Sequence, residues 1–564
     1  MSRRWGAGPL DDGRTRFALW APDRDAVTLE IDGAEPLAMT ADGDGWFVAT
    51  TAAPAGTRYR FRCGDLILPD PASRAQAGGV HGWSLVIDPA YPWATADWRG
   101  RPWEETVLIE LHAGVLGGFR GLMDQIPTLA ALGFTAIELM PIGAFGGSRN
   151  WGYDGVLPYA PAEAYGAPAD LKALVDEAHA FGVSVFLDVV YNHFGPDGNY
   201  LNAYAADFFD AGVDTPWGGA VAVEREAVHR FFVDNALMWL GDYRIDGLRF
   251  DAVHAIANPG FLDAMAAEVR AAFPHRHIHL VLENEDNDAD RLKDGGYDAQ
   301  WNDDFHNVMH VLLTGETSAY YGDFADRPAE RLARCLSDGF IYQGEGSPNH
   351  DGKPRGKPSA HLAPTRFVSF LQNHDQVGNR ALGERLTVLT DTARLRAATA
   401  LLLLGPQIPL FFMGDEQGSE SPFLFFTDFH DYLADAVREG RRKEFAKFDA
   451  FADPAARERI PDPNALETFE RSRPEPGPDA AGWRDLIRDL IALRQSAIVP
   501  HLAGAKALGA EATGDAAVTA RWRLGDGSIL TVALDLAYDP DPLPQGEGEL
   551  LHAEGERFAA WIAR

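Results

Sequence analysis

Apolar and polar residues alternate along the first part of the chain, from about residue 16 to residue 92. RFALWAP, VTLEIDG and TRYRFRCG each place apolar side chains at nearly every second position, and turn sequences such as DG, GDG and PAG separate them. This alternation is typical of half-buried antiparallel strands and predicts a small β-sandwich. A similar pattern in AVTARWRL and SILTVALDL predicts a second small β domain near the C-terminal end.

Between these two regions, short apolar segments alternate with amphipathic stretches. The predicted strands are TVLIELHAG, TAIELMPI, VSVFLDVVYNH, DGLRFDAV, IHLVLENED, DAQWNDDF, RFVSFLQNHD and QIPLFFMGDE. The predicted helices include DLKALVDEAHAFG, REAVHRFFVDNALMWLGDY, PGFLDAMAAEVRAAF, TARLRAATALLLLG and WRDLIRDLIALRQ. Near-continuous apolar strands are expected where both faces of a parallel sheet are buried. Eight strands in β/α alternation predict a (β/α)₈ barrel with insertions.

The chain is a multidomain α/β protein on this interpretation. With 564 residues it exceeds the usual size of a single core. We expect an immunoglobulin-like sandwich, similar to a carbohydrate-binding module, at 1–95, the barrel at 96–502, and the C-terminal β domain at 503–564. A doubly wound open sheet is the alternative, but GxGxxG and GxxxxGK[ST] motifs are absent after the predicted strands, so the sequence does not indicate a nucleotide site.

Charge and cysteine content narrow the class of ligand. The formal net charge is -33, from 50 Lys and Arg against 83 Asp and Glu. Such a charge disfavours nucleic acids and anionic membranes, and favours a neutral ligand. Cys63 and Cys335 are far apart and lack zinc-site spacing, no EF-hand-like loop occurs, and MSRRWGAGPLDDG has no apolar segment of a signal peptide. We therefore expect a cytoplasmic protein without a metal or other cofactor.

Ionisable residues gather where four of the predicted strands end. They are Asp188, Asn192 and His193 after VSVFL, Arg249 and Asp251 in GLRFD, Glu283 after HLVL, and His374 and Asp375 after FVSFLQN. An acid at one strand end is often only a helix cap. Four such groups on one rim exceed what capping explains, and the carboxyl ends of barrel strands are where active sites lie.

The spacing within these groups suggests roles. Arg249 and Asp251 are two residues apart, so on a strand they point to the same side, and the guanidinium would keep Asp251 ionised as a nucleophile requires. Glu283 follows an apolar run, where partial desolvation would favour a protonated general acid. His193 and His374, as neutral donors and acceptors, suit sugar hydroxyls, although each is equally well explained as an internal partner of a loop.

Aromatic residues lie in the loop after the second predicted barrel strand. NWGYDGVLPYAP contains Trp151, Tyr153 and Tyr159, and Phe145 is nearby. Flat apolar rings are natural platforms for the faces of sugars, but aromatic loops also occur as plain packing. Both interpretations remain open at this point.

Four motifs in order, DVVYNH, GLRFDAVH, LENE and FLQNHD, resemble the signature regions of the α-amylase superfamily of retaining glycoside hydrolases. The resemblance covers nearly the whole chain, since this superfamily combines a sandwich, a barrel and a C-terminal β domain. It implies that Asp251 is the nucleophile, Glu283 the acid/base and Asp375 the carboxylate that stabilises the transition state. The residues that it implies for substrate binding are Arg249, His193, His374, Tyr153, Asn192, Asp188, His254 and Trp151.

Longer stretches, among them MPIGAFGGSRNWGYDGVLPYAP and LQNHDQVGNRALGERL, resemble the trehalose-releasing members of this superfamily. That resemblance implies an α-1,4-glucan ending in trehalose as substrate and a synthase of this glucan acting before it. MGDEQGSE departs from the expected pattern at Gln417, which puts detail near the eighth strand in doubt.

Two alternatives remain. A branching enzyme, or another amylase-type hydrolase, would share the same acidic residues. A non-catalytic glucan-binding protein is disfavoured because Asp251, Glu283 and Asp375 are all intact.

Overall fold

The N-terminal part of the chain forms two packed antiparallel sheets. The computed structural model describes residues 5–215, 218–256, 258–446, 451 and 453–564. One sheet has the order β1-β2-β6-β5 and the other β4-β3-β7-β10-β9. Their bounds are β1 Gly8–Pro9, β2 Arg14–Trp20, β3 Thr28–Ile31, β4 Leu37–Ala38, β5 Thr40–Ala41, β6 Trp46–Ala52, β7 Arg58–Cys63, β9 Gln76–Ala77 and β10 Trp83–Leu85. Phe17 of β2 and Tyr59 of β7 meet between the sheets with their ring centroids 4.8 Å apart, so the predicted sandwich is confirmed.

A closed parallel barrel follows, in the order β11-β12-β15-β18-β19-β20-β23-β24. Its strands are β11 Leu108–Leu111, β12 Ala136–Leu139, β15 Ser184–Val189, β18 Gly247–Phe250, β19 His279–Leu282, β20 Ala299–Trp301, β23 Phe367–Phe370 and β24 Ile408–Phe412. Every one lies inside a segment that the apolar pattern predicts as a strand. The barrel prediction is confirmed.

Helices connect most of these strands. The main ones are α1 Gly118–Leu132, α2 Pro168–Ala180, α3 Glu226–Asp242, α4 Pro259–Ala272, α5 Asp303–Thr314, α6 Pro328–Asp338, α9 Thr392–Leu404 and α13 Ala480–Ala497. Local sequence sets their ends: Asn258 accepts a hydrogen bond from the Gly260 N–H at the start of α4, and Gly133 ends α1 with φ of 98°. Between β19 and β20 the connection holds only a short 3-10 helix, Ala289–Arg291.

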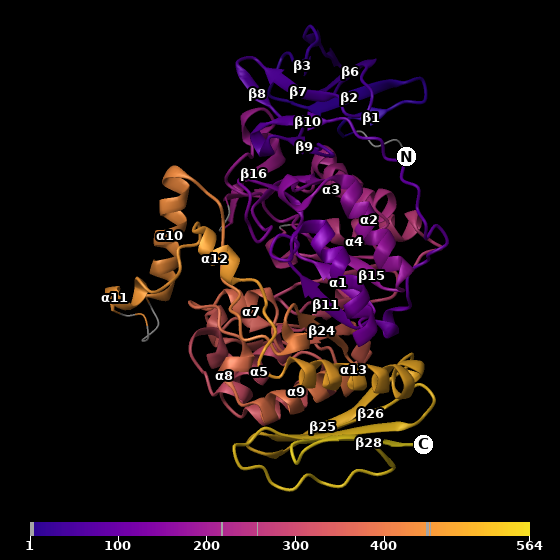
Figure 1. Ribbon diagram of the computed structural model, residues 1–564, viewed down its shortest axis with the longest axis vertical. Coiled ribbons are helices and arrows are strands. Elements are labelled where there is room, and N and C mark those ends of the chain that lie inside the picture. The colour runs from indigo at the N-terminus through magenta and orange to yellow at the C-terminus, as the bar shows by residue number, and fades with distance from the viewer. Residues whose placement is uncertain (1–4, 216–217, 257, 447–450, 452) are drawn as a thin grey trace.

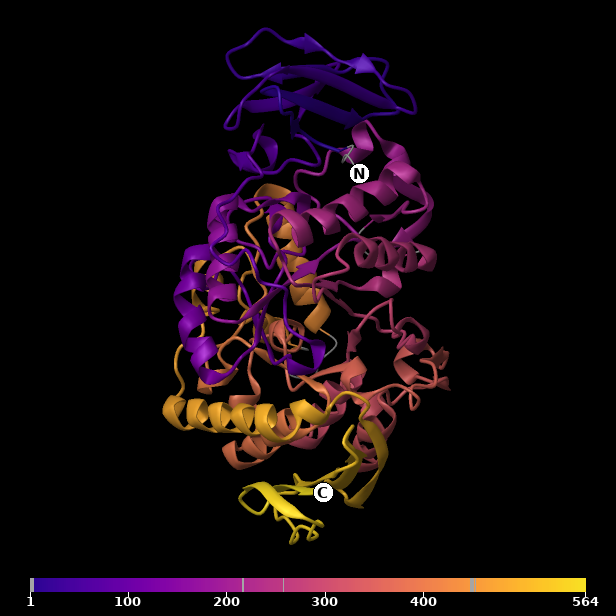
Figure 2. The ribbon, with the colours of Figure 1, turned by 90° about the vertical axis from the view of Figure 1, so that its right-hand side faces the viewer.

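The three parts are arranged along the long axis of the molecule. In Figure 1 the N-terminal sandwich lies at one end, the barrel in the middle and the C-terminal sheet at the other end, and Figure 2 shows the same order from the side. Trp5 joins the sandwich region to the barrel, since its indole N–H donates to the carbonyl of Ala227 in α3 at 3.0 Å. The domain limits 1–95, 96–502 and 503–564 stay predictions.

The C-terminal sheet has the order β25-β26-β27-β29-β28 and packs on α6 and α9. Its strands are β25 Lys506–Gly514, β26 Ala517–Arg523, β27 Ile529–Asp535, β28 Glu549–Glu554 and β29 Phe558–Ala563. The predicted strands in AVTARWRL and SILTVALDL are confirmed.

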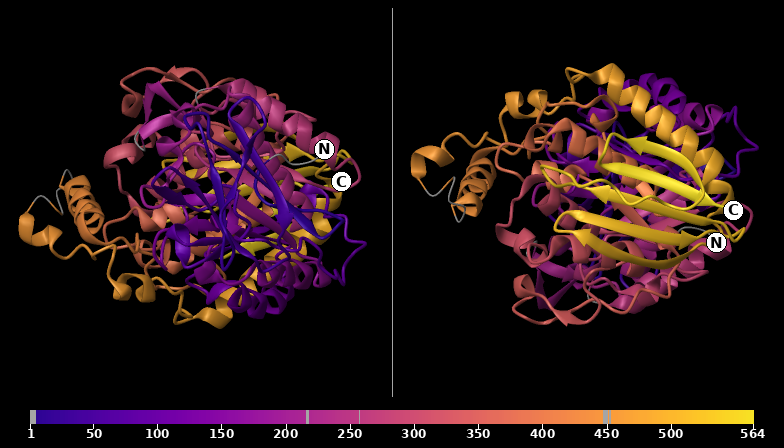
Figure 3. Two further views of the ribbon diagram at one scale, coloured as in Figure 1. Left: turned by 90° about the horizontal axis from the view of Figure 1, so that it is seen from above. Right: turned by 90° about the horizontal axis from the view of Figure 1, so that it is seen from below.

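The chain between β24 and α13 contains an insertion that the sequence did not predict as helical. It includes α10 Asp431–Phe445, α11 Pro454–Arg457 and α12 Leu466–Arg471. Both views of Figure 3 show α10 and α11 projecting from the side of the barrel. Among the described residues, none of the helices combines the length and the apolar character needed to cross a bilayer.

Candidate active site

Strand alternation directs one set of side chains into the mouth of the barrel. A Cβ on Gly247 would meet the Phe186 ring at 2.3 Å, so position 247 faces inward. Two and four residues later, Arg249 and Asp251 follow on the same side. The parallel register pairs Arg249 with Val281 of β19, which brings Asp251 level with Glu283. Two predicted functional carboxylates therefore meet at the carboxyl ends of neighbouring strands.

Arg249 is the centre of this cluster and its side chain is fully buried. One nitrogen, Nη1, contacts Asp188 Oδ2 at 2.6 Å and Asp251 Oδ1 at 2.9 Å, and Nη2 contacts Glu283 Oε2 at 2.7 Å. The expected contact between Arg249 and Asp251 is present. The contact with Glu283 was not predicted.

Further hydrogen bonds orient the two carboxylates. Asn192 donates through Nδ2 to Asp251 Oδ2 at 3.0 Å, and the Ala252 N–H donates to Glu283 Oε2 at 2.8 Å. Both oxygens of Asp251 are thereby engaged, Oδ1 by Arg249 and Oδ2 by Asn192, whereas both contacts to Glu283 use Oε2. The arrangement fits one group that attacks a substrate and one that exchanges a proton with it.

His374 is held by a carboxylate that the sequence did not single out. Glu110 of β11 contacts the ring Nδ1 through Oε1 at 2.6 Å and accepts the backbone N–H of His374 through Oε2 at 2.9 Å. Burial alone would lower the pKa of His374, but the Glu110 and Asp375 carboxylates outweigh it and raise the pKa to about 9. The expectation of a neutral His374 is wrong, because at neutral pH this ring is an imidazolium 3.4 Å from Asp375.

This charge predicts an alkaline limit to activity. The folded pKa of His374, about 9, lies above the ordinary value of about 6.5. The imidazolium therefore stabilises the fold fully below about pH 6.5, and this contribution is lost as the pH rises through 9. Glu110→Gln removes a carboxylate that raises the pKa of His374. The pKa of His374 should therefore fall, and the alkaline decrease in kcat/KM should move toward neutral pH.

The measurement is kcat/KM against pH for the wild type and for Glu110→Gln, with thermal unfolding at pH 6 and pH 9 as the control for folding. Identical alkaline limbs in the two proteins would show that Glu110 does not set the charge of His374.

Tyr153 links Asp188 to the His374 ring. The Tyr153 hydroxyl donates to Asp188 Oδ2 at 2.6 Å, and its ring stacks on His374 with centroids 5.0 Å apart. Burial raises the pKa of Asp188 to about 7 against the opposing effect of Arg249, and the Asp251 carboxylate adds to the increase. Asp188 shares Arg249 Nη1 with Asp251, and substrate binding by Tyr153 and Asp188 stays a prediction.

Two aromatic residues do not have the expected surface for a sugar. Trp151 is 5% exposed, stacks on Phe423 and donates its indole N–H to the carbonyl of Leu424. Tyr159 is fully buried and its hydroxyl donates to the carbonyl of Phe231. Of the two interpretations left open, the structure favours packing at these positions, because Phe423 stacks on the Trp151 ring and Phe231 of α3 packs against the Tyr159 ring.

His193 is already engaged by the protein through both ring nitrogens. Nδ1 contacts the Asn192 side chain and Nε2 contacts the carbonyl of Tyr153 at 2.8 Å. A sugar hydroxyl would have to replace one of these partners. Binding of substrate by His193 therefore stays a prediction.

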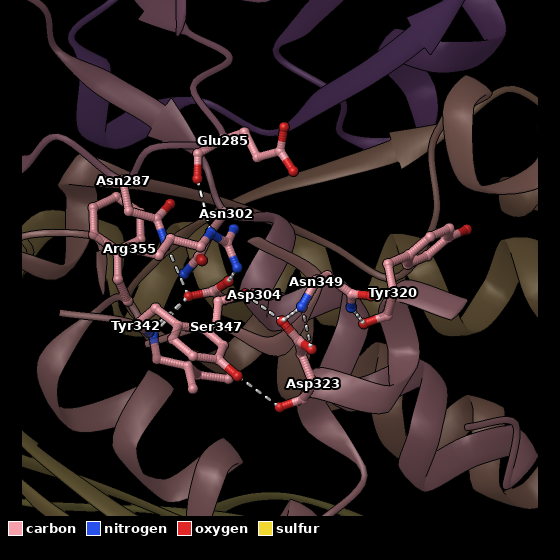
Figure 4. Close-up of polar contacts among 12 residues, drawn as sticks. Glu285, Asn287, Asn302, Asp304, Tyr320, Asp323, Tyr342, Ser347, Asn349 and Arg355 are labelled. Atoms are coloured by element: carbon pink, nitrogen blue, oxygen red, sulfur yellow. Dashed lines mark hydrogen bonds and ion pairs between the residues drawn. The ribbon is translucent and has the colours of Figure 1, made fainter. Parts of the chain in front are cut away.

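The loop after Glu283 is drawn in part in Figure 4, where Glu285 and Asn287 are labelled. Glu285 and Asp286 are exposed, as expected for rim residues. Glu285 contacts His254 at 3.7 Å and His350 at 3.2 Å. His254 thus lies on this rim, and its contact with substrate stays a prediction.

Three inward-facing residues were missed in the sequence. Glu110 and Glu138 occupy matching positions in IEL of β11 and IEL of β12, and the register pairs them. Glu138 is fully buried with neither oxygen hydrogen-bonded within the described part of the chain, and burial raises its pKa well above the usual value. Trp301 lies under Arg249, whose Cζ is 4.1 Å from the ring centroid. An acid inside an otherwise apolar strand was the available signal for both glutamates.

Gln417, where the sequence departs from the expected motif, contacts the outer layer of helices around the barrel. Arg484 of α13 donates to the Gln417 side-chain oxygen at 2.6 Å. In the same turn, Asp415 accepts from Gln372 at 2.6 Å. Gln417 therefore bonds to a covering helix, away from the Arg249 cluster.

No group of three or more His, Cys, Asp or Glu side chains suited to a metal ion occurs among the residues that the structure describes. Independence from metal stays a prediction.

The chain is similar to proteins of known name along most of its length. Residues 66–209 match the family described as alpha amylase, catalytic domain, and residues 505–560 match a domain of unknown function, DUF3459. Malto-oligosyltrehalose trehalohydrolase of Deinococcus radiodurans is 40% identical over 88% of this chain and 84% of that protein. The protein of the same name from Saccharolobus solfataricus is 41% identical over 77% and 79%. The chain belongs to the malto-oligosyltrehalose trehalohydrolase family.

Solved structures share the fold of the chain. A putative alpha amylase from Salmonella typhimurium is 43% identical, covers both chains completely and has a TM-score of 0.94. A pullulanase from Anoxybacillus has a TM-score of 0.70 at 17% identity, which shows the shared fold alone. As a trehalohydrolase-family member with an α-amylase catalytic domain, the chain is a glycoside hydrolase.

Proposed function

We propose that the chain hydrolyses the α-1,4-glucosidic bond next to the terminal trehalose unit of maltooligosyltrehalose, releasing trehalose and a maltooligosaccharide. The observation that carries this proposal is the 37–41% identity to seven proteins named malto-oligosyltrehalose trehalohydrolase, over 77–92% of the chain. The convergence of Asp251 and Glu283 on Arg249 supports it.

The proposed mechanism is a double displacement with retained configuration. Asp251 attacks the anomeric carbon of the glucan, while Glu283 gives its proton to the oxygen at C4 of the departing trehalose. Glu283, now a carboxylate, then takes a proton from water, whose oxygen attacks the anomeric carbon and frees Asp251. Two carboxyl groups about 5 Å apart suit this sequence of steps.

The remaining residues would bind and orient the substrate. Asp375, 36% exposed beside the charged His374, is proposed to stabilise the transition state. Tyr153 and His374 would border the sugar that Asp251 attacks, and Asn192 would hold Asp251 in place. Asp188 and Arg249, which contact each other in the same cluster, would also bind the substrate.

The substrate's chemistry places another enzyme before this one. A glucan ending in trehalose must be made by a synthase that converts the reducing end into an α,α-1,1 linkage. We propose that the chain follows such a synthase in the cytoplasm and has no nucleic acid or membrane partner, in keeping with its charge of -33.

A branching enzyme is the nearest rival. The branching enzyme of Pseudoalteromonas atlantica is 30% identical, but over only 42% of this chain and 38% of that protein. Both reactions pass through a glycosyl-enzyme, and they differ in whether water or a sugar hydroxyl receives the glucan.

Product analysis tests the proposal. Incubation with maltooligosyltrehalose should release free trehalose, and kcat/KM should exceed that for plain maltooligosaccharides of equal length. Equal values would favour an ordinary amylase, and new α-1,6 branches would favour the branching enzyme.

A further inference from the structure

Two consecutive aspartates begin α5, and their surroundings differ sharply. Asp304 is fully buried, whereas Asp303 is partly exposed at the mouth of the barrel. Both follow β20, which lies between β19, the strand of Glu283, and β23, the strand that precedes Asp375.

Asp304 lies among the polar contacts drawn in Figure 4, where it meets Asn287 and Arg355. Its Oδ2 accepts from Asn287 Nδ2 at 3.0 Å and from the Ile341 N–H at 2.8 Å, and Oδ1 contacts Arg355 Nη1 at 3.1 Å. Arg355 in turn donates to the carbonyl of Glu285 at 2.8 Å. Asp304 therefore ties together the loop after Glu283 and the segment that contains Arg355.

Asp303 does not take part in this network of Asp304. Within the part of the chain that the structure describes, its side chain makes no hydrogen bond or ion pair. It is the first residue of α5, two positions after Trp301, which ends β20 and packs inside the barrel. Burial, followed by the nearby Glu283 carboxylate, raises the pKa of Asp303 well above its usual value, and Asp375 adds to the increase. Asp303 thus begins α5 at the carboxyl end of β20, which pairs with β19, the strand that precedes Glu283, and its carboxyl oxygens are not bonded to other described residues.

The chemistry of cleavage indicates which part of the substrate would lie next to Asp303. The broken bond joins the anomeric carbon of the glucan to an oxygen of the trehalose unit, so trehalose is the leaving group and departs on the side of Glu283. Sugar hydroxyls are hydrogen-bond donors, and an unpaired carboxyl group next to them is a natural acceptor.

We propose that Asp303 is a substrate-binding residue that accepts a hydrogen bond from a hydroxyl of the departing sugar. This inference rests on the proposed direction of cleavage, with Glu283 on the leaving side. It assigns to α5 a contact that Asp304, one residue later, cannot make because its oxygens are already bonded to the protein.

A pair of substrates separates this role from a structural one. Maltooligosyltrehalose has a leaving sugar, whereas α-maltosyl fluoride offers the same glucan side with a leaving group that has no hydroxyls. Asp303→Ala should lower kcat/KM about tenfold or more for the first and change it less than about twofold for the second. Asp303→Asn, which keeps one acceptor oxygen, should fall between Asp303→Ala and the wild type.

Asp304→Asn is the matched control, because it changes the neighbouring side chain in the same turn of α5. It should lower the melting temperature and reduce kcat/KM for both substrates by the same factor. If Asp303→Ala also reduces both substrates equally, or reduces neither, the inference is overturned.

These measurements distinguish a wrong proposed function from a wrong role of Asp303. If the wild type releases no trehalose, the function is wrong, and the same comparison can be made with a plain maltooligosaccharide as the substrate with a leaving sugar. If the wild type releases trehalose and Asp303→Ala behaves as the wild type, only the role of Asp303 is wrong.

Discussion

Asp251→Asn and Glu283→Gln should each lower kcat for maltooligosyltrehalose by about three orders of magnitude or more. Asn cannot form the covalent bond to the anomeric carbon, and Gln cannot donate a proton to the departing oxygen. Both replacements keep the size of the side chain at the rim of the barrel, so the fold should persist. The measurement is kcat from trehalose release, with circular dichroism and thermal unfolding to verify the fold.

The two roles can be told apart with α-maltosyl fluoride. Fluoride departs without a proton, so Glu283→Gln should form the glycosyl-enzyme from this substrate at a rate much closer to that of the wild type. Asp251→Asn should remain inactive because the attacking group is missing. Near-normal turnover of maltooligosyltrehalose by either variant would refute the assignment.

Arg249→Met should reduce both activity and stability strongly. The guanidinium contacts Asp188, Asp251 and Glu283 and is fully buried. Its loss leaves buried carboxylates without compensation, at a cost of about 3–5 kcal/mol in the free energy of unfolding. The two reacting carboxylates also lose their common support, so kcat should fall by about two orders of magnitude or more. Arg249→Lys should not restore activity, because one ammonium cannot serve three carboxylates in the geometry of a guanidinium.

Arg494→Met is the control for burial alone. Arg494 is also fully buried, but it donates to the backbone carbonyls of Leu403, Gly405 and Gln407, before the start of β24 and away from the rim. This variant should unfold at a lower temperature yet keep the kcat of the wild type while folded. Unchanged kcat in folded Arg249→Met would contradict the role of Arg249.

The sequence by itself determined the order of the elements and singled out most of the residues that meet around Arg249. Apolar strands and amphipathic helices have local periods, so all eight barrel strands could be located before the structure was known. The spacing of Arg249 and Asp251 fixed their common direction, because two residues on a strand always share a face.

Only the tertiary structure decided which charges meet and which rings are covered. Glu110 and His374 are 264 positions apart, and their contact turns an expected neutral ring into an imidazolium. Trp151 became part of the core because Phe423, on a distant loop, stacks on it. Protonation and exposure depend on neighbours that closure of the barrel brings together, and local periodicity carries no information about those neighbours.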